Sequence, residues 1–407
     1  MKLSDIAEFI TDKISSSSIS LDNYVTTDSL LQNKRGRELA QNLPPMQCAL
    51  TNYKKGDVLV ANIRPYLKKV WFADSEGGCS SDVLVFRAKN EHYPSFLYAI
   101  LMQDAFFDYA MLGAKGSKMP RGDKNQIMRY ELPTFTSAEE ENIGNIMVDV
   151  ISKINVNRQI NDNLEAMAKQ LYDYWFVQFD FPNEEGKPYK SSGGAMVWNE
   201  KLKREIPEGW NVANVFDELS VQYGFPFSTE LFTEDPTSIP VVRIRDILVN
   251  SVSAYSEEEV DEKYKLQKQD LLVGMDGNFH MNYWNDNVAY LNQRSVRLRA
   301  KSKSTVSIMQ AKYDIAPYIK AKELRAKGST VGHLSDKDLK ELFVLVCPNI
   351  NFRNKFDSIL AEIIENRCEM IELTKQRDEL LPLLMNGQAS VNYHLSVYFF
   401  RAFSYII

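Results

Sequence analysis

Apolar and polar positions between Glu139 and Phe176 follow the spacing of one long amphipathic helix. Apolar or small residues recur along a single seam, at Ile143, Met147, Val150, Ile154, Leu164, Ala168, Leu171 and Trp175. Asn157 and Asn161 continue this seam, and no Pro or Gly interrupts the segment after Gly144. The heptad pattern predicts a helix roughly 50 Å long that packs along its length against a partner.

A second seam of the same kind lies near the C-terminus, at Phe356, Ile359, Ile363, Asn366, Met370, Leu373, Leu380 and Leu384. Arg377 is a charged exception within it, and Asn366 is a polar position in its middle. A buried amide in such a seam sets the register of two helices. The matched patterns predict an antiparallel pair of helices; the alternative is that each helix packs only on its own domain.

Residues 1–135 have the pattern of a mixed α/β domain. Its expected elements are a helix over Leu3–Phe9, a strand near Tyr24–Thr27, strands at Val58–Ala61 and Val83–Phe86, a helix over Phe96–Tyr109, and a Gly/Lys loop at 113–124. Residues 210–350 repeat this plan. Residues 57–60 correspond to 270–273, and residues 83–117 correspond to positions 212 residues later. A constant spacing between divergent segments indicates duplicated domains.

We therefore expect a mixed α+β fold, in which two duplicated globular domains are separated by two long antiparallel helices that form a coiled coil. The expected boundaries are domain 1 at 1–138, the first helix at 139–178, a connector at 179–209, domain 2 at 210–350, the second helix at 351–388, and a tail at 389–407.

Composition and charge exclude several protein classes. Four cysteines without paired spacing and four scattered histidines argue against a disulfide framework and a zinc site. The chain has neither a signal sequence nor a membrane-length apolar run, so we expect a cytoplasmic protein with no membrane partner. The net charge of −6 disfavours nucleic-acid binding, but residues 291–330 hold ten Lys/Arg against two Asp/Glu. Such a local basic surface can attract phosphate.

Several segments resemble the specificity subunit of type I restriction–modification systems. They are LEAMAKQLYDYWF (164–176), FDFP (179–182), GKPYKSSGG (186–194), IPEGW (206–210) and RDELLPLLMNGQ (377–388). The resemblance implies two variable domains that each read half of a split sequence in double-stranded DNA. It also implies helices that set the distance between the half-sites and dock two methyltransferase subunits, with restriction subunits joining that core.

Candidate DNA-contacting residues are cationic, amide, hydroxyl and aromatic side chains in loops, because such groups bind phosphates and base edges. In the first domain they are Arg64, Tyr66, Lys68, Lys115, Ser117, Lys118 and Arg121. In the second they are Asn278, His280, Asn282, Tyr283, Arg294, Ser329, Thr330 and His333. A solvated loop is the alternative for each residue. Arg87 and Arg299 are equally compatible with structural roles, and Trp71 and Trp284 with core positions.

No catalytic motif is present. The closest match to an amino-methyltransferase motif, residues 43–46, lacks both of its ends, and there is no phosphate-binding GxxxxGK[ST] loop. The hypothesis of a nuclease that uses Asp57 with residues 338–340 has little support, because such short patterns arise by chance in any charged chain. We expect a non-catalytic subunit without a metal site. The resemblance implies that its partner subunits bind S-adenosylmethionine, ATP and Mg.

The outer faces of the helices are the expected partner-binding surface, for example at Arg158, Asp162, Lys169 and Tyr172, although a solvated helix face is the alternative. A different class of function also remains open: a coiled-coil adaptor that binds proteins and not DNA. Such a protein needs no basic loops, so its retention on DNA would not depend steeply on salt.

Overall fold

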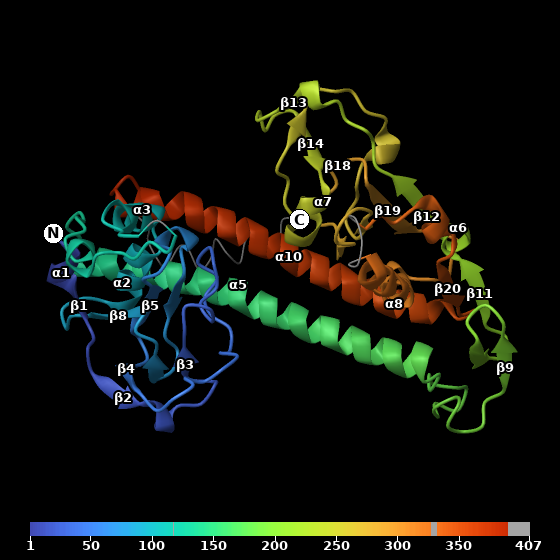
Figure 1. Cartoon of the computed structure of the whole chain (residues 1–407), viewed down its shortest axis with the longest axis horizontal. Helices are drawn as coiled ribbons and strands as arrows, with labels where there is room; N and C mark the ends of the chain where they lie inside the picture. The colour runs from blue at the N-terminus through green and yellow to red at the C-terminus, as the bar shows by residue number, and fades with distance from the viewer. Residues whose placement is uncertain (117, 327–331, 390–407) are drawn as a thin grey trace. The chain divides into compact units, whose positions relative to one another are not determined.

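The computed structural model describes residues 1–116, 118–326 and 332–389, which fall into two compact units. Unit 1 holds residues 1–155 together with the described residues from 372 onward, and unit 2 holds residues 156–371. The long helices α5 (Ser137–Tyr172) and α10 (Ile350–Met385) contribute residues to both units (Figure 1). Each unit therefore combines one globular repeat with segments of both helices.

Unit 1 is built on two four-stranded sheets. The central sheet is antiparallel, with β1 (Ala7–Phe9), β8 (Val83–Ala88), β5 (Val58–Ala61) and β6 (Val70–Phe72) in that order. The second sheet contains β2 (Lys13–Ser15), β4 (Ala49–Tyr53), β7 (Gly77–Cys79) and β3 (Tyr24–Val25), of which the last two are parallel. All four side chains of β5 are buried, which explains why its sequence is a continuous apolar run.

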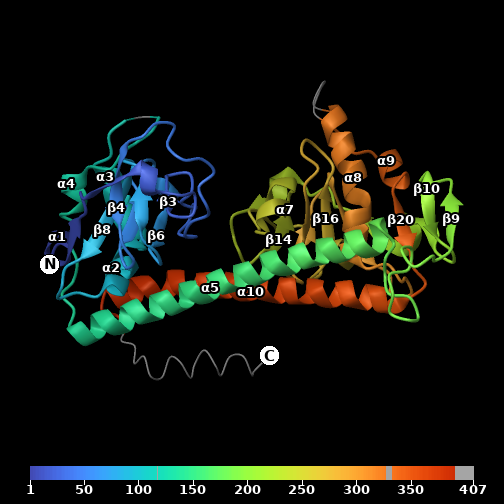
Figure 2. The ribbon, with the colours of Figure 1, turned by 90° about the horizontal axis from the view of Figure 1, so that it is seen from below.

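Four short helices complete the globular part of unit 1: α1 (Leu3–Ile6), α2 (Pro94–Leu101), α3 (Asp104–Leu112) and α4 (Lys124–Ile127). Figure 2 shows α2 between the central sheet and α5. A Cβ atom added at Gly144 of α5 would lie only 2.3 Å from Ser95 Oγ and 2.7 Å from the Phe96 backbone nitrogen. The glycine in the first seam therefore lets α5 approach the start of α2 closely.

Unit 2 repeats the central sheet in the same strand order, and it also has a second four-stranded sheet, in which the strand order differs from that of unit 1. Its central sheet has β12 (Leu219–Tyr223), β19 (Ser295–Ala300), β16 (Leu271–Gly274) and β17 (Met281–Tyr283) in that order. The second sheet, with β13 (Phe232–Thr233), β15 (Tyr255–Ser256), β14 (Ile239–Val242) and β18 (Tyr290–Leu291), also ends in a parallel pair. The expectation of two duplicated domains of mixed helix and sheet is confirmed.

The remaining elements of unit 2 surround these sheets. The helices are α6 (Val215–Glu218), α7 (Ile244–Val249), α8 (Ile308–Ala326) and α9 (Asp336–Lys340). Two further antiparallel pairs join β9 (Met196–Asn199) to β10 (Arg204–Pro207) and β11 (Asn211–Asn214) to β20 (Phe343–Val346).

The two long helices run antiparallel where their seam meets inside unit 2. The Asn161 side-chain amide donates to the Ile363 carbonyl at 3.1 Å and accepts from the Asn366 amide at 3.0 Å. The Asn157 amide, one turn earlier, donates to Glu369 Oε2 at 2.6 Å. Asn157 and Asn161 are both buried, and a buried amide without a hydrogen-bond partner would destabilise the fold. These contacts supply the partners. The predicted pairing of the two seams is confirmed.

Two local predictions were wrong. The helix expected over Leu3–Phe9 ends at Ile6, and the next three residues form β1. The helix expected over Phe96–Tyr109 is divided into α2 and α3, because Gln103 has an extended backbone between them. The connector contains the β9–β10 hairpin, and Phe181 stacks between Tyr189 and Trp210 at 4.7 and 4.9 Å. Aromatic packing of this kind leaves no helical or strand periodicity in a sequence.

Candidate nucleic-acid interface

Three chain segments of unit 1 meet where β5 ends and β8 begins. They are residues 62–64, residue 82 and residues 115–122, which we call the loop junction of unit 1. The backbone hydrogen bonds between them run from Asn62 N to Asp82 O (2.8 Å), from Arg64 N to Pro120 O (2.7 Å) and from Gly122 N to Asn62 O (3.2 Å). These bonds give three otherwise separate loops one common framework.

Unit 2 contains the same junction at positions 212 or 213 residues later. The loop junction of unit 2 consists of residues 275–277, residue 294 and residues 332–334. Its corresponding hydrogen bonds run from Met275 N to Arg294 O (2.8 Å), from Gly277 N to Gly332 O (2.9 Å) and from Leu334 N to Met275 O (2.7 Å). The duplication therefore extends from the strands to the hydrogen bonds of the connecting loops.

The junction of unit 1 presents several cations to solvent. Arg64, Lys115, Lys118 and Arg121 are all exposed there. Arg121 forms an ion pair of 3.1 Å with Asp82, while the Arg64 guanidinium has no hydrogen bond or ion pair with any residue that the structure describes. Four neighbouring cations on one set of loops can attract DNA phosphates, and arginine can also bind the edge of guanine.

The junction of unit 2 carries a different set of charges on the same framework. Arg294 Nη1 lies 2.6 Å from Asp276 Oδ2, and His333 Nδ1 lies 2.5 Å from Asp276 Oδ1. Burial acts to raise the pKa of Asp276, but the hydrogen bonds and charges of His333 and Arg294 outweigh it and hold that pKa below its usual value. The side chains of Arg294 and His333 both remain more than half exposed, so they can meet a ligand while Asp276 orients them.

One arginine in each junction has a left-handed backbone conformation. The φ angles are 51° for Arg64 and 65° for Arg294. Non-glycine residues seldom adopt this conformation, because the Cβ atom approaches the following carbonyl oxygen at a cost of about 1 kcal/mol. The position in unit 2 that matches Arg64 is occupied by Gly277, which has a φ of 72°. Unit 1 thus carries a long charged side chain where glycine would be favoured.

The other candidates of unit 1 lie beside its junction or have structural partners. Tyr66 is half exposed on the short 3-10 turn Pro65–Leu67. Lys68 forms an ion pair of 2.9 Å with Asp104 at the start of α3, so its charge is partly engaged inside the unit. Ser117 lies outside the described residues, as do Ser329 and Thr330 of unit 2.

The candidates between 278 and 283 divide between the surface and the core. Asn278 is exposed and His280 is partly exposed next to the junction of unit 2. The Asn282 amide instead donates to the Ile247 and Leu248 carbonyls and accepts from Arg367. Tyr283 is only 2 % exposed, so the prediction that it contacts DNA was wrong. Its alternation with polar neighbours reflects a strand with one buried face.

Several residues that could have either contacted DNA or supported the fold have structural roles. Arg87 binds Asp57 through two hydrogen bonds of 2.7 Å, and Arg299 binds Asp270 in the same way at 2.6 and 2.7 Å. Trp71 and Trp284 are buried in the cores of their units, as expected.

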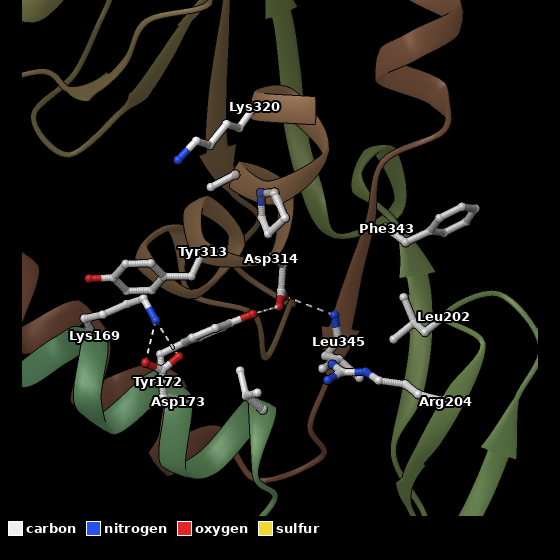
Figure 3. A pocket seen from close by; sticks show the side chains of 13 residues that line it. Lys169, Tyr172, Asp173, Leu202, Arg204, Tyr313, Asp314, Lys320, Phe343 and Leu345 are labelled. Atoms are coloured by element: carbon white, nitrogen blue, oxygen red, sulfur yellow. Dashed lines mark hydrogen bonds and ion pairs between the residues drawn. The ribbon is translucent and has the colours of Figure 1, made fainter. Parts of the chain in front are cut away.

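The proposed helix surface for partner subunits is only partly available. Asp162 is exposed and Lys169 is half exposed, with an ion pair to Asp173. Arg158 is partly buried. Tyr172 was predicted to face outward, but it is 8 % exposed, and its hydroxyl donates to Asp314 Oδ1 at 2.8 Å (Figure 3). The aromatic ring faces the globular part of unit 2, so Tyr172 leaves the set of docking candidates.

Tyr172 and Asp314 line a pocket of about 580 Å³ in unit 2, between the end of α5, β10, α8 and β20 (Figure 3). The Asp314 carboxylate also accepts hydrogen bonds from the Leu345 backbone N–H at 3.1 Å and the Gln310 amide at 3.2 Å. Burial raises the pKa of Asp314 to about 6, against the opposing effect of these hydrogen bonds. Because every contact of the carboxylate joins parts of unit 2, we assign the pair a structural role.

Neither a metal site nor a membrane-spanning helix is found in the part of the chain that the structure describes. In residues 1–116, 118–326 and 332–389, no three His, Cys, Asp or Glu side chains are grouped to bind a metal ion. Within the same ranges, no helix has the length and apolar character needed to cross a bilayer. The acids of the nuclease pattern serve local roles, since Asp57 binds Arg87 and Asp338 binds Lys322.

Residue-by-residue inspection of the sequence missed the acids of the two junctions, Asp82 and Asp276. The signal that could have identified them is the constant offset between the repeats. Asp82 precedes β8 as Arg294 precedes β19, so aligning the repeats exposes a reversal of charge at one position.

Known proteins resemble the whole of this arrangement. A family model described as a type I restriction modification DNA specificity domain matches residues 1–166 and 207–382, and each match covers one globular repeat with part of the helix that follows. The type I restriction enzyme MjaIX specificity subunit of Methanocaldococcus jannaschii is 24% identical over 359 residues, which cover 85% of this chain and 80% of that protein.

Two further relatives agree with this match. The EcoBI specificity subunit of Escherichia coli is 26% identical over 187 residues, or 44% of this chain and 37% of that protein. The crystal structure of a type I restriction–modification S subunit from M. genitalium superposes with a TM-score of 0.56, at 15% identity and over 95% of both chains. At that identity, the structural likeness concerns the fold alone.

Proposed function

Because this chain belongs to the type I restriction–modification DNA specificity family, we propose that it reads a two-part sequence in double-stranded DNA, one half with each unit. We further propose that it docks two methyltransferase subunits and the restriction subunits of a type I complex. The chain itself supplies recognition, while S-adenosylmethionine, ATP and Mg serve the partner subunits.

The observation that best supports two-part recognition is the duplicated loop junction. Both junctions have the same backbone hydrogen bonds, but they differ in charge and in the segment that carries the arginine. A common framework with different side chains suits two domains that bind the same type of polymer and prefer different base sequences.

The experiment for this proposal compares methylated DNA with and without the gene. A strain that carries the chain and its methyltransferase partner should methylate a split motif, and deletion of the gene should abolish that methylation. Long-read sequencing detects both states. Retention of every split motif after deletion would refute the proposal.

A protein-only adaptor differs from this proposal in its salt dependence. A chain that neutralises DNA phosphates loses affinity steeply as salt rises, since bound counterions are released on binding. The affinity of the assembled complex for a duplex that carries the motif should therefore fall roughly 10³-fold as salt increases from 50 to 200 mM, if several phosphates are contacted. An affinity for duplex DNA that stays flat over this range would favour the adaptor.

Partner docking is proposed for the exposed face of α5 around Asp162 and Lys169. Reversing the charge of both residues, as Asp162→Lys with Lys169→Glu, should weaken capture of the methyltransferase subunit, because charged groups at an interface repel like charges. The matched control is Lys187→Glu in the exposed connector. Equal capture by the reversed variant and the control would exclude this face as the docking surface.

A further inference from the structure

We propose that Arg64 and Arg294 are the guanine-reading residues of unit 1 and unit 2, and that Asp276 positions Arg294. This inference rests on the proposed function, since it assigns base readout within two DNA-binding units. It concerns which side chains determine the sequence that each unit prefers.

The first argument is the position of the two arginines on a common framework. Arg64 lies in the segment that follows β5, whereas Arg294 lies in the turn that precedes β19. The three repeated hydrogen bonds place these segments at the same end of the central sheets. Each junction therefore presents one exposed arginine with a left-handed backbone, but from a different segment. A guanidinium displaced in this way would meet a different base position in each half-site.

The second argument is the backbone conformation. Both arginines are left-handed, while the residue matching Arg64 in the other repeat is glycine. Strained backbone persists where the surrounding structure holds it, and it clusters at sites where the direction of a side chain matters. A cation that merely neutralises phosphate has no need of a defined direction, whereas a bidentate contact with the O6 and N7 atoms of guanine does.

The third argument is the reversal of charge between the junctions. In unit 1, Asp82 binds Arg121 at 3.1 Å and leaves Arg64 without a carboxylate partner among the described residues. In unit 2, the residue matching Asp82 is Arg294 itself, and Asp276 holds it at 2.6 Å. The carboxylate contact with Nη1 restricts the guanidinium fork, which lowers the entropy that Arg294 loses on meeting a base.

The test uses the full chain with its methyltransferase partner, and it measures the methylated motif together with thermal unfolding. The variants are Arg64→Gly and Arg294→Gly, which place glycine where left-handed backbone is favoured. The matched control is Lys203→Gly. Lys203 is exposed and left-handed too, with a φ of 52°, but it lies at the β9–β10 turn.

We expect Arg64→Gly to relax one guanine position in one half of the motif, with discrimination at that position falling roughly 10- to 100-fold. Arg294→Gly should do the same in the other half only. Asp276→Asn should weaken the same position as Arg294→Gly to a smaller degree. All three should unfold at temperatures close to that of the wild type, and Lys203→Gly should keep the complete motif.

Gly277→Arg adds a test by gain of function. A Cβ atom at Gly277 would meet no atom of the described residues within 4 Å, so the side chain of unit 1 can be placed there without a clash with them. This variant should change the half of the motif that Arg294→Gly changes, and leave the other half intact.

Three results would overturn the inference. One is an unchanged motif in both arginine variants of a complex whose wild type methylates a split motif. Another is a uniform loss of affinity across all sequences, which would assign the arginines to phosphate. The last is relaxed specificity that accompanies a large fall in unfolding temperature. A wild-type complex that methylates no split motif would refute the proposed function as well.

Discussion

Asp57 and Asp270 occupy the same buried position just before β5 and β16, and each binds an arginine of the neighbouring strand. Their side chains also accept from the backbone N–H groups of Lys54 and Gln267, which closes the turn before each strand. The repeated pairing shows why Arg87 and Arg299 recur at one offset: they are needed for the sheet, and their recurrence carries no information about a ligand.

Replacing Asp57 with Asn should lower the free energy of unfolding by on the order of 3 kcal/mol, because it leaves the Arg87 guanidinium without its carboxylate partner. Urea unfolding of the full chain, followed by circular dichroism, measures the change. Lys203→Ala, at an exposed pair, is the control and should leave stability unchanged. Equal stability of Asp57→Asn and wild type would show that the pair contributes little.

Asp314 should make the stability of unit 2 depend on pH. Its pKa of about 6 in the folded chain lies above the unfolded value of 3.8, so protons bind the folded state more tightly. The resulting stabilisation is complete below pH 3.8 and is lost as the pH rises through 6.

The measurement is the difference in unfolding free energy between wild type and Asp314→Asn, which does not titrate. The unfolding free energy of the wild type, relative to that of Asp314→Asn, should fall by on the order of 2 kcal/mol between pH 4 and pH 7. A constant difference over that range would exclude the raised pKa.

At the level of single residues, the sequence identified most of the exposed Lys, Arg and His side chains that the structure gathers at the two junctions. Arg64, Lys115, Lys118 and Arg121 converge in unit 1, as Arg294 and His333 do in unit 2. It failed for Tyr172 and Tyr283, because an aromatic residue among polar neighbours looks the same on a buried and on an exposed face. Only the pairing of strands and helices decides which way such a ring points.

The long helices are the elements that the sequence predicted best. Their expected starts at 139 and 351 lie within two residues of the observed Ser137 and Ile350. A heptad repeated over many turns is a strong signal, because a single seam must face one partner throughout. The short helices between 94 and 112 were merged, since one extended residue at Gln103 leaves no mark in the hydrophobic pattern.

The asparagine layer of the helix pair should show energetic coupling. Asn161→Ala and Asn366→Ala each remove one side of a hydrogen bond of 3.0 Å, and the double variant removes both. We expect a coupling free energy of about 1 kcal/mol in a double-mutant cycle measured by thermal unfolding. A second cycle, which combines Asp162→Ala at an exposed position with Asn366→Ala, gives the uncoupled reference. Additive effects for the asparagines would mean that they do not interact.

For the molecule as a whole, the sequence indicated a duplication, and the duplication proved to include hydrogen bonds that no sequence pattern displays. The equivalence of Asn62 with Met275, and of Asp82 with Arg294, preserves the backbone contacts while the side chains at these positions change. A shared framework with divergent surface residues is what two recognition domains of one chain require. The domain limits themselves, such as 1–138 and 210–350, stay predictions.

The most direct test of two-part recognition exchanges one unit's globular domain and leaves the other intact. Residues 1–135 are replaced by the corresponding domain of another family member, and the methylated motif is determined by long-read sequencing of DNA from cells that also express the methyltransferase partner. We predict that one half of the split motif changes to a new sequence, while the other half is kept. A motif that stays whole, or one in which both halves change together, would contradict the assignment of one half-site to each unit.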